Sequence, residues 1–506
     1  MIHNLLEKAA TDFPHKEAVV CGSRRFLYKE LEEAANKLAR FLSDNGVNSG
    51  DRIGIFSNKI AEEIIAIFAI LKINCVFVQI NPQFLENHLS HVISNCDIRI
   101  LFVSNAKTKI LERAYKKKCP IKLIISLSAE IDLNRHAFRK VVCLGDILKK
   151  SSKSTKVPSD SDNNDIASII YTSGSTGMPK GIIVTNNILY TSTVASTEVL
   201  GNRHDDRLIS TAPFAFDGAL SQLLTMFFVG GTIVLQHSNF PKDIVNTLIQ
   251  EKITGFHAVP SLWIMLLQNY SPFSKNEYPQ LRYISFIGES FPERYLGKLK
   301  KILGNTRIYA MYGTTEAFRS TYLPPEDLEK KPQSIGKPFP GVNVTIVDKQ
   351  NNICPTGEIG EIVHKGVFIS PGYWNDEEHT KETFKNGSLY TGDLGKMDKE
   401  GYLYFVGRMD GMIKTSGYRV SPEEIERCIY QIEGIKETVV LGVPDDEVGN
   451  KVKVIAVCKD GVTLKPREII NHCRSRLPNY MVPGIVQFQE KLPKTATNKV
   501  NRSELN

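Results

Sequence analysis

The chain has 506 residues and a formal net charge of +8, a modest excess for its length because Lys and Arg are interleaved with Asp and Glu. Apolar residues make up 42% and charged residues 23%, which is ordinary for a soluble globular protein. We therefore expect no nucleic-acid partner. The nine cysteines are scattered without C-x-x-C spacing, so neither a disulfide framework nor a zinc site is expected.

No segment predicts insertion into a membrane. The longest strongly apolar run, residues 64–71, is far too short to span a bilayer. The N-terminus, MIHNLLEKAATDF, has early acidic residues and lacks the apolar core of a signal peptide. We expect a cytoplasmic protein.

Helical and strand patterns alternate near the N-terminus. Residues 31–42 and 60–71 have the apolar spacing of helices, and residues 51–56 and 75–80 read as short buried strands. Such alternation predicts a layered α/β domain with a largely parallel sheet.

The later segments differ in composition. A polar stretch at 151–165 predicts a surface linker, and another α/β region follows from 166 to 323. Short strands with frequent Gly and Pro predict a small β-rich lobe over 335–406. The remainder reads as a compact α/β tail, so we divide the chain into a domain of residues 1–407 and a smaller domain of residues 408–506.

The most informative segment is the loop YTSGSTGMPKG at 171–181, which lies between two strand-like runs. Glycines let the backbone approach an anion, hydroxyls and N–H groups donate to phosphate oxygens, and Lys180 adds a positive charge. No Gly-Lys-Ser/Thr ends the loop, so it is not a Walker motif. The loop predicts phosphate binding, and a plain Gly/Ser turn is the alternative.

This loop resembles the phosphate-binding signature of the adenylate-forming superfamily, which contains acyl-CoA synthetases, adenylation domains of nonribosomal peptide synthesis, stand-alone carrier-protein ligases and beetle luciferase. Further motifs resemble that superfamily in its order: MYGTTE at 311–316, YTGDLG at 390–395, GRMDGMIKTSGYRV at 407–420 and LPKTATNKVNR at 492–502. The resemblance implies an AMP-forming reaction that uses ATP and Mg²⁺, makes an acyl-adenylate and passes the acyl group to a phosphopantetheine thiol.

The resemblance also implies nucleotide contacts. Tyr312 would stack on adenine, Thr315 would touch the α-phosphate and Glu316 would help to hold Mg²⁺. Asp393 would bind the ribose hydroxyls and Arg408 would be a second nucleotide contact. The other nucleotide-binding residues implied in this way are Thr172, Ser173, Gly174, Ser175, Thr176, Gly177, Lys180, Gly288, Glu289, Ser290, Met311, Gly313 and Thr314.

The last two motifs imply a mobile C-terminal domain. Lys499 matches the adenylation lysine, which would bridge the substrate carboxylate and the α-phosphate and stabilise charge in the transition state. Asp410 matches the hinge between the domains. Ser416 and Gly417 match the loop that enters the active site when the thioester forms. Asn498 stands where a glycine is usual, which bears on the flexibility of the lysine loop.

The acid pocket is less well defined. Asp217 resembles the aspartate of amino-acid-activating domains that pairs with the substrate amine, and the alternative is a cap on a helix that begins near Ala219. Arg319 would hold a second substrate carboxylate or form a structural ion pair. The pocket residues carried over by the resemblance form a small, polar set: Asp217, Gly218, Ser221, Ser285, Ile287, Met311, Arg319 and Ser320.

Three functional hypotheses follow. The leading one is a ligase that activates a small carboxylic acid, an amino acid or another small polar acid, and loads it onto a carrier protein. Because the sequence ends directly after the lysine motif, the carrier protein is expected in trans. The second hypothesis is an acyl-CoA synthetase that uses free coenzyme A. A non-catalytic nucleotide-binding protein is the third, and the intact motifs weigh against it.

Overall fold

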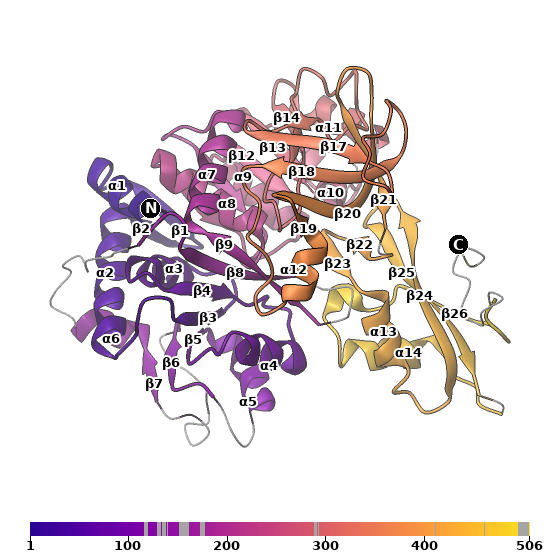
Figure 1. The fold of residues 1–506 in the computed structure, drawn as a ribbon. Helices are drawn as coiled ribbons and strands as arrows, with labels where there is room; N and C mark the ends of the chain where they lie inside the picture. Colours follow the sequence, from indigo (N-terminus) through magenta and orange to yellow (C-terminus); the bar gives the residue numbers. More distant parts are fainter. Residues whose placement is uncertain are drawn as a thin grey trace.

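The computed structural model describes residues 1–115, 120–128, 133, 138, 140–150, 161–172, 178–287, 291, 293–409, 411–459, 461–493 and 505. Two large, mostly parallel sheets dominate the part of the chain before the β-rich lobe (Figure 1). The seven-stranded sheet has the order β7-β6-β5-β3-β4-β8-β9. Its strands are β7 (Val141–Cys143), β6 (Leu123–Ser126), β5 (Ile100–Val103), β3 (Arg52–Phe56), β4 (Val76–Gln79), β8 (Ile166–Thr172) and β9 (Lys180–Thr185), and all pair in parallel except β8 with β9.

The nine-stranded sheet has the order β16-β15-β14-β13-β12-β10-β11-β1-β2. Its inner strands, all parallel, are β14 (Arg307–Tyr312), β13 (Tyr283–Ile287), β12 (Gly255–Ala258), β10 (Arg207–Ser210), β11 (Thr232–Leu235) and β1 (Glu17–Cys21). The antiparallel outer strands are β16 (Lys337–Pro338), β15 (Thr321–Leu323) and β2 (Arg24–Leu27).

Helices between the sheets form the largest core. The helix α3 (Ala61–Lys72) is apolar nearly all round and buried along almost its whole length, as a helix in the interior must be. Its core includes residues from both sheets, such as Ile53 and Leu208. The other helices before the lobe are α1 (Asn4–Asp12), α2 (Tyr28–Asp44), α4 (Glu86–Asn95), η1 (Asn105–Lys107), α5 (Thr108–Ala114), α6 (Leu144–Lys150), α7 (Asn186–Leu200), α8 (Asp217–Val229), α9 (Pro241–Gln250), α10 (Pro260–Leu266), η3 (Phe273–Lys275) and α11 (Glu293–Leu303).

These elements confirm the layered α/β architecture predicted from hydrophobic periodicity. The strand and helix patterns expected over 31–80 correspond to α2, β3, α3 and β4, with ends shifted by a few residues. Most of the expected linker at 151–165 lies outside the described residues. Within the described part of the chain, no helix is both long and apolar enough to cross a membrane, and the eight cysteines there are free thiols.

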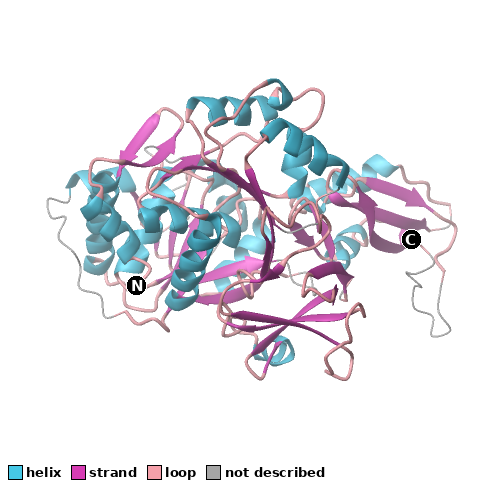
Figure 2. Cartoon of the chain, turned by 90° about the horizontal axis from the view of Figure 1, so that it is seen from above, coloured by secondary structure: helices cyan, strands magenta, loops and turns pink. Residues whose placement is uncertain are grey.

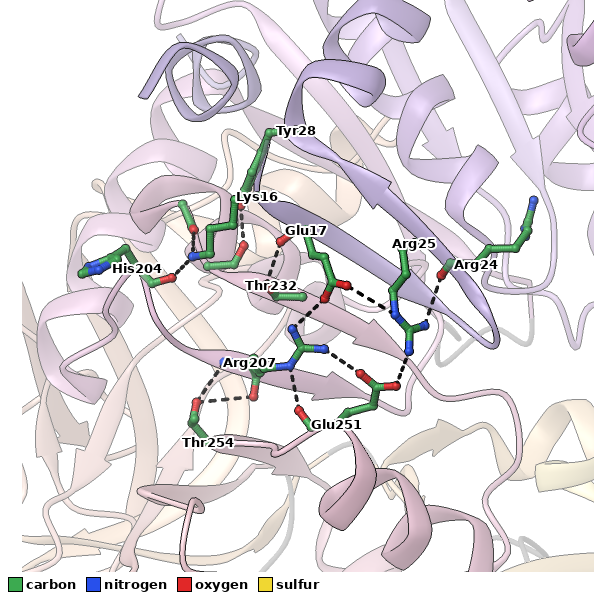
Figure 3. A network of polar contacts seen from close by, with 12 residues as sticks. Lys16, Glu17, Arg24, Arg25, Tyr28, His204, Arg207, Thr232, Glu251 and Thr254 are labelled. Atoms are coloured by element: carbon green, nitrogen blue, oxygen red, sulfur yellow. Dashed lines mark hydrogen bonds and ion pairs between the residues drawn. The ribbon is translucent and has the colours of Figure 1, made fainter. Parts of the chain in front are cut away.

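A network of ion pairs fixes the N-terminal hairpin to the nine-stranded sheet (Figure 3). Arg207 on β10 lies 2.9 Å from Glu17 on β1 and 2.6 Å from Glu251, which follows α9. Arg25 on β2 contacts the other oxygen of Glu251 at 2.6 Å. Two arginines therefore share two carboxylates, and such a network gives more stabilisation than isolated surface pairs. It ties β1 to β10 across the strand between them, β11.

The β-rich lobe and the C-terminal part follow. The lobe is an antiparallel sheet of β17 (Val342–Val347), β18 (Gly360–Gly366), β19 (Phe384–Lys385), β20 (Ser388–Met397) and β21 (Leu403–Arg408), with the short helix α12 (Glu377–Thr383). The C-terminal part contains β22 (Ile413–Thr415), β23 (Tyr418–Val420), α13 (Pro422–Ile429), β24 (Ile435–Asp445), β25 (Gly449–Cys458), α14 (Pro466–Arg474), η4 (Asn479–Met481) and β26 (Ile485–Phe488).

The C-terminal part has a hydrophobic core of its own, drawn from residues between Ile413 and Phe488. Figures 1 and 2 both show it projecting from one side of the larger part. The predicted β-rich lobe and compact α/β tail are both confirmed.

Candidate active site

A cavity of about 1000 Å³ runs along the carboxyl ends of the parallel strands of the nine-stranded sheet. Its wall includes Gly313 after β14, Ile287 at the end of β13, Val259 after β12, Ala212 after β10 and His237 after β11. Ligands of open α/β sheets bind at this edge, because loops of neighbouring strands meet there.

The end of β14 brings together three residues of the expected nucleotide site. The hydroxyl of Tyr312 donates to Oδ2 of Asp393 at 2.7 Å, and the guanidinium of Arg408 pairs with the other carboxylate oxygen. Asp393 and Arg408 face each other across β20 and β21. Burial, followed by the charge of Asp393, raises the pKa of Tyr312 well above its ordinary value, so the phenol stays protonated and acts as a donor.

A smaller cavity of about 280 Å³ adjoins this cluster and has the chemistry of a phosphate and metal site. Thr172, Lys180, Glu316, Arg408 and Arg419 are among its lining residues. Three cationic side chains and one hydroxyl suit an anionic ligand, and the carboxylate of Glu316 suits the cation that accompanies it.

Glu316 fits a divalent cation. Its Oε1 accepts a hydrogen bond from the hydroxyl of Tyr373 at 3.1 Å and lies 3.5 Å from Arg419. Its buried Oε2 has no hydrogen-bond partner among the described residues. Burial by itself raises the pKa of Glu316, but the charges of Arg419 and Arg408 outweigh it, and the net pKa lies below the ordinary value. An ionised carboxylate with an unsatisfied oxygen is a suitable ligand for Mg²⁺, which takes one or two carboxylates alongside phosphate oxygens.

Asp217 lines the part of the large cavity in which the acid substrate is expected, and its carboxylate is already ion-paired. Its Oδ2 lies 3.6 Å from the guanidinium of Arg319, and its Oδ1 accepts from the hydroxyl of Thr315 at 3.3 Å. Burial raises the pKa of Asp217, whereas Arg319 and Thr315 act against that shift. The helix α8 begins at Asp217 with Phe216 as its N-cap and no capping side chain, so the helix-cap alternative does not describe Asp217.

The expected pocket residues divide into two groups. Asp217, Gly218 and Ile287 line the cavity. The others are buried and stand outside the lining of this cavity in the described part of the chain: Ser221, Ser285, Met311, Arg319 and Ser320. Arg319 therefore supports Asp217 from behind the wall, and its contacts are those of a structural ion pair.

His257 is a cavity residue that no motif identifies. Its Nδ1 lies 2.6 Å from the hydroxyl of Ser285, and its Nε2 would lie 3.5 Å from a Cβ added at Gly218. Burial, with a smaller contribution from Arg319, lowers the pKa of His257 to about 3, so the imidazole is neutral. The acid pocket thus combines a paired carboxylate with a neutral imidazole.

The C-terminal hairpin of β22 and β23 closes one side of the cavity. Ser416 and Gly417 form its tip and line the cavity. Gly417 has a φ of +82°, and a Cβ there would lie 2.6 Å from Cγ1 of Val259. The neighbouring Tyr418 accepts from the amide of Gln83 at 2.8 Å. No side chain fits at Gly417 while the hairpin is docked in this position.

Comparison with known proteins identifies the family. Residues 6–374 match the family described as AMP-binding enzyme, and residues 424–499 match the AMP-binding enzyme C-terminal domain. The chain belongs to the AMP-binding enzyme family. The resemblance to the adenylate-forming superfamily is thereby confirmed, and this AMP-binding enzyme is an AMP-forming ligase.

Two relatives of this AMP-binding enzyme differ in how much of their length it matches. It is 28% identical to a long-chain-fatty-acid–CoA ligase of Bacillus subtilis (strain 168), over all of this chain and 94% of that protein. It is also 27% identical to tyrocidine synthase 3 of Brevibacillus parabrevis, over all of this chain and 8% of that protein. The solved structure of o-succinylbenzoate CoA synthetase from Bacillus subtilis matches with a TM-score of 0.85 at 25% identity, over 99% of this chain and 97% of that one.

A buried contact between the two parts of this AMP-binding enzyme was also not anticipated from the sequence. Nε2 of His88 on α4 lies 2.6 Å from Oε1 of Glu424 on α13, and both side chains are nearly inaccessible to solvent. Several expected site residues lie outside the described residues, namely Ser173, Gly174, Ser175, Thr176, Gly177, Gly288, Glu289, Ser290, Asp410 and Lys499.

Proposed function

We propose that this ligase activates a small polar carboxylic acid as its acyl-adenylate and transfers the acyl group to the phosphopantetheine thiol of a carrier protein. The observation that carries the proposal is the joint wall of the large cavity. Thr315, Asp217 and Gly417 line one continuous space, so a nucleotide, an acid and a thiol arm can meet there.

In the first half-reaction, an oxygen of the substrate carboxylate attacks the α-phosphorus of ATP and pyrophosphate leaves. Tyr312, Asp393 and Arg408 would hold the nucleoside, while Thr315 would donate to the α-phosphate. Glu316 would hold Mg²⁺, which neutralises phosphate charge when bound. Lys499 would stabilise the charge that develops between the two reactants.

In the second half-reaction, the thiol sulfur attacks the acyl carbonyl and AMP leaves. The glycine at the hairpin tip supports a thiol path, since Gly417 approaches Val259 so closely that only a narrow arm fits beside it. We further propose that the domain that follows Arg408 turns about Asp410 as a unit between the half-reactions, while Arg408 stays paired with Asp393 in the lobe. Its separate core and its few buried contacts with the larger part, such as His88 with Glu424, are compatible with such a motion.

The polar character of the acid pocket supports a polar substrate. Asp217 is a hydrogen-bond acceptor at the cavity wall, and an amine or hydroxyl on the acid would donate to it. A long apolar tail would leave Asp217 and His257 without hydrogen-bonding solvent, which is unfavourable for buried polar groups.

Coenzyme A is the second candidate acceptor, because the long-chain-fatty-acid–CoA ligase matches the chain over nearly its whole length. The test measures acid-dependent exchange of pyrophosphate into ATP over a panel of amino acids and plain acids, and then thioester formation with coenzyme A, pantetheine and a phosphopantetheinylated carrier protein. A carrier-protein ligase uses the carrier best and treats coenzyme A and pantetheine alike. A strong preference for coenzyme A over pantetheine would overturn the carrier assignment, since only an enzyme that binds the nucleotide of coenzyme A shows it.

A further inference from the structure

The large cavity extends beyond the acid pocket to a polar end. We call the distal end the part lined by Asn58, Lys59, Gln236, His237 and Asn239. Because β12, β10 and β11 are successive strands of the sheet, the end of β11 lies two strand spacings from the end of β12, roughly 10 Å. His237 and Asn239 therefore lie well past Val259, where the hairpin tip docks, and the ammonium of Lys59 lies nearer, at the end of β10, the strand beside β12.

Lys59 is a buried cation at this distal end. Its side chain is 6% exposed, and its ammonium donates to the carbonyl oxygens of Ser210 and, at 3.3 Å, Ala212. An ammonium has three protons, so these two carbonyls leave one donor for the cavity. In the part of the chain that the structure describes, no carboxylate lies within ion-pair distance of Lys59.

The acidic group that acts most on Lys59 is Glu63, which is one turn further along the chain. Burial raises the pKa of Glu63 to about 8, which weakens this side chain as a counter-charge for Lys59. Burial likewise lowers the pKa of Lys59 to about 7, so an anion bound beside it would raise that pKa and favour the ammonium form. A buried cation that faces a cavity and lacks a counter-charge is unfavourable unless a ligand supplies one.

The neighbours of Lys59 also favour an anion. Nε2 of His237 lies 3.4 Å from Sγ of Cys21, and burial, with Lys59 and Arg24, lowers the pKa of His237, so the ring is neutral. The distal end adds the amides of Asn58 and Asn239, whereas the amide of Gln236 already donates to the carbonyl of Ser238, and its five residues include no carboxylate. A purely structural role for Lys59, in which it only holds the end of β10, would explain its two contacts with carbonyl oxygens. Such a role does not require Lys59 to line the cavity, as it does.

We propose that the distal end binds a second anionic group of the acid substrate, a carboxylate in the simplest case. This inference rests on the proposed function and narrows it. The substrate class becomes acids that carry an anion at the far end from the carboxyl group that is activated.

The test compares matched pairs of acids by acid-dependent pyrophosphate exchange. The pairs are succinate and butyrate, adipate and hexanoate, suberate and octanoate, and sebacate and decanoate. For the length that spans the cavity, wild-type enzyme should favour the diacid by about tenfold or more in kcat/KM, since a charge-assisted contact to a buried ammonium is formed. Lys59→Met should bring that ratio close to one.

Lys72→Met is the matched control, because Lys72 is also buried but does not line the cavity. Its ammonium lies 2.7 Å from the carboxylate of Glu32. It should keep the wild-type ratio. If Lys59→Met does not fold, Lys59→Gln keeps a donor for the two carbonyls and removes only the charge. Each ratio is measured within one protein, so a general loss of stability does not change it.

The outcomes separate this inference from the proposed function. Exchange with monoacids and no preference for any diacid overturns the distal anion site and leaves the ligase assignment intact. A diacid preference that survives loss of the Lys59 charge also overturns the site. Absence of exchange with all of these acids, while amino acids support exchange, overturns the distal site alone, and absence of exchange with these acids and with amino acids overturns both.

Discussion

Gly417→Ala should separate the two half-reactions. In the docked arrangement the new Cβ would lie 2.6 Å from Cγ1 of Val259, far inside normal contact. The left-handed backbone, with a φ of +82°, adds about 1 to 2 kcal/mol for any residue with a Cβ, and overpacking adds about 1 to 3 kcal/mol. Together these terms disfavour the docked hairpin by roughly 2 to 5 kcal/mol.

Such a change reduces the docked population by roughly thirty-fold to several thousand-fold, because each 1.4 kcal/mol is a factor of ten. Transfer of the acyl group from pre-formed adenylate, measured in a single turnover, should slow by that factor. Acid-dependent pyrophosphate exchange should stay within about twofold of wild type, since Gly417 lies outside the cavity that Glu316 and Arg408 line.

Two further variants make the reasoning refutable. Gly461 has a φ of +77° and nothing within 4 Å of an added Cβ, so Gly461→Ala has the backbone cost without the contact and should leave transfer unchanged. Val259→Ala removes Cγ1 and should restore part of the activity of Gly417→Ala. If pyrophosphate exchange falls as far as transfer, or if Val259→Ala restores nothing, the hairpin tip does not control the thiol step.

Three other predictions address the remaining parts of the site. Lys499→Ala should lower pyrophosphate exchange by roughly a hundredfold or more and spare transfer from pre-formed adenylate; equal losses would contradict its role. His88→Leu should slow transfer about tenfold or more, because a buried polar contact between the two parts is lost. Glu424→Gln should have a milder effect, because the amide oxygen still accepts a hydrogen bond. An equal effect on pyrophosphate exchange would indicate a general defect. Asp217→Asn should reduce kcat/KM for an amino acid by about tenfold or more relative to its deaminated analogue, because a hydrogen bond to a carboxylate is lost, with an unchanged KM for ATP; identical behaviour of both acids would exclude amine recognition.

Local patterns predicted the fold because they act within one element. The apolar spacing over 60–71 has one low-energy solution, a buried helix, and the structure has α3 there. The ends of strands vary by a residue or two, since frayed ends depend on their neighbours. The order of the strands could not be predicted in this way. β1 pairs with β11, and the Arg207 ion pairs hold these distant parts of the sequence together. No local pattern encodes that pairing.

The motif residues of the nucleotide site were predictable because they recur at fixed spacing. Single residues without a motif were not. His257 and Lys59 face the cavity only because their strands and loops end at one edge of the sheet. Whether Arg319 points into the cavity or behind its wall depends on the tight turn after β14, where Phe318 has a φ of +49°. That turn sends the guanidinium toward Asp217, and only the folded chain shows it.

The Asp217 and Arg319 pair changes what the acid pocket can recognise. A free carboxylate in a buried pocket needs a cationic ligand, and a free guanidinium needs an anionic one. Here each neutralises the other at 3.6 Å, so neither charge by itself requires a charged group on the substrate. Lys59 has no carboxylate within ion-pair distance among the described residues, and its ammonium contacts the carbonyl oxygens of Ser210 and Ala212 at the end of β10. With the proposed distal anion site, electrostatic selectivity for the acid would belong to the distal end, whereas Asp217 would contribute hydrogen bonding near the reacting carboxyl group.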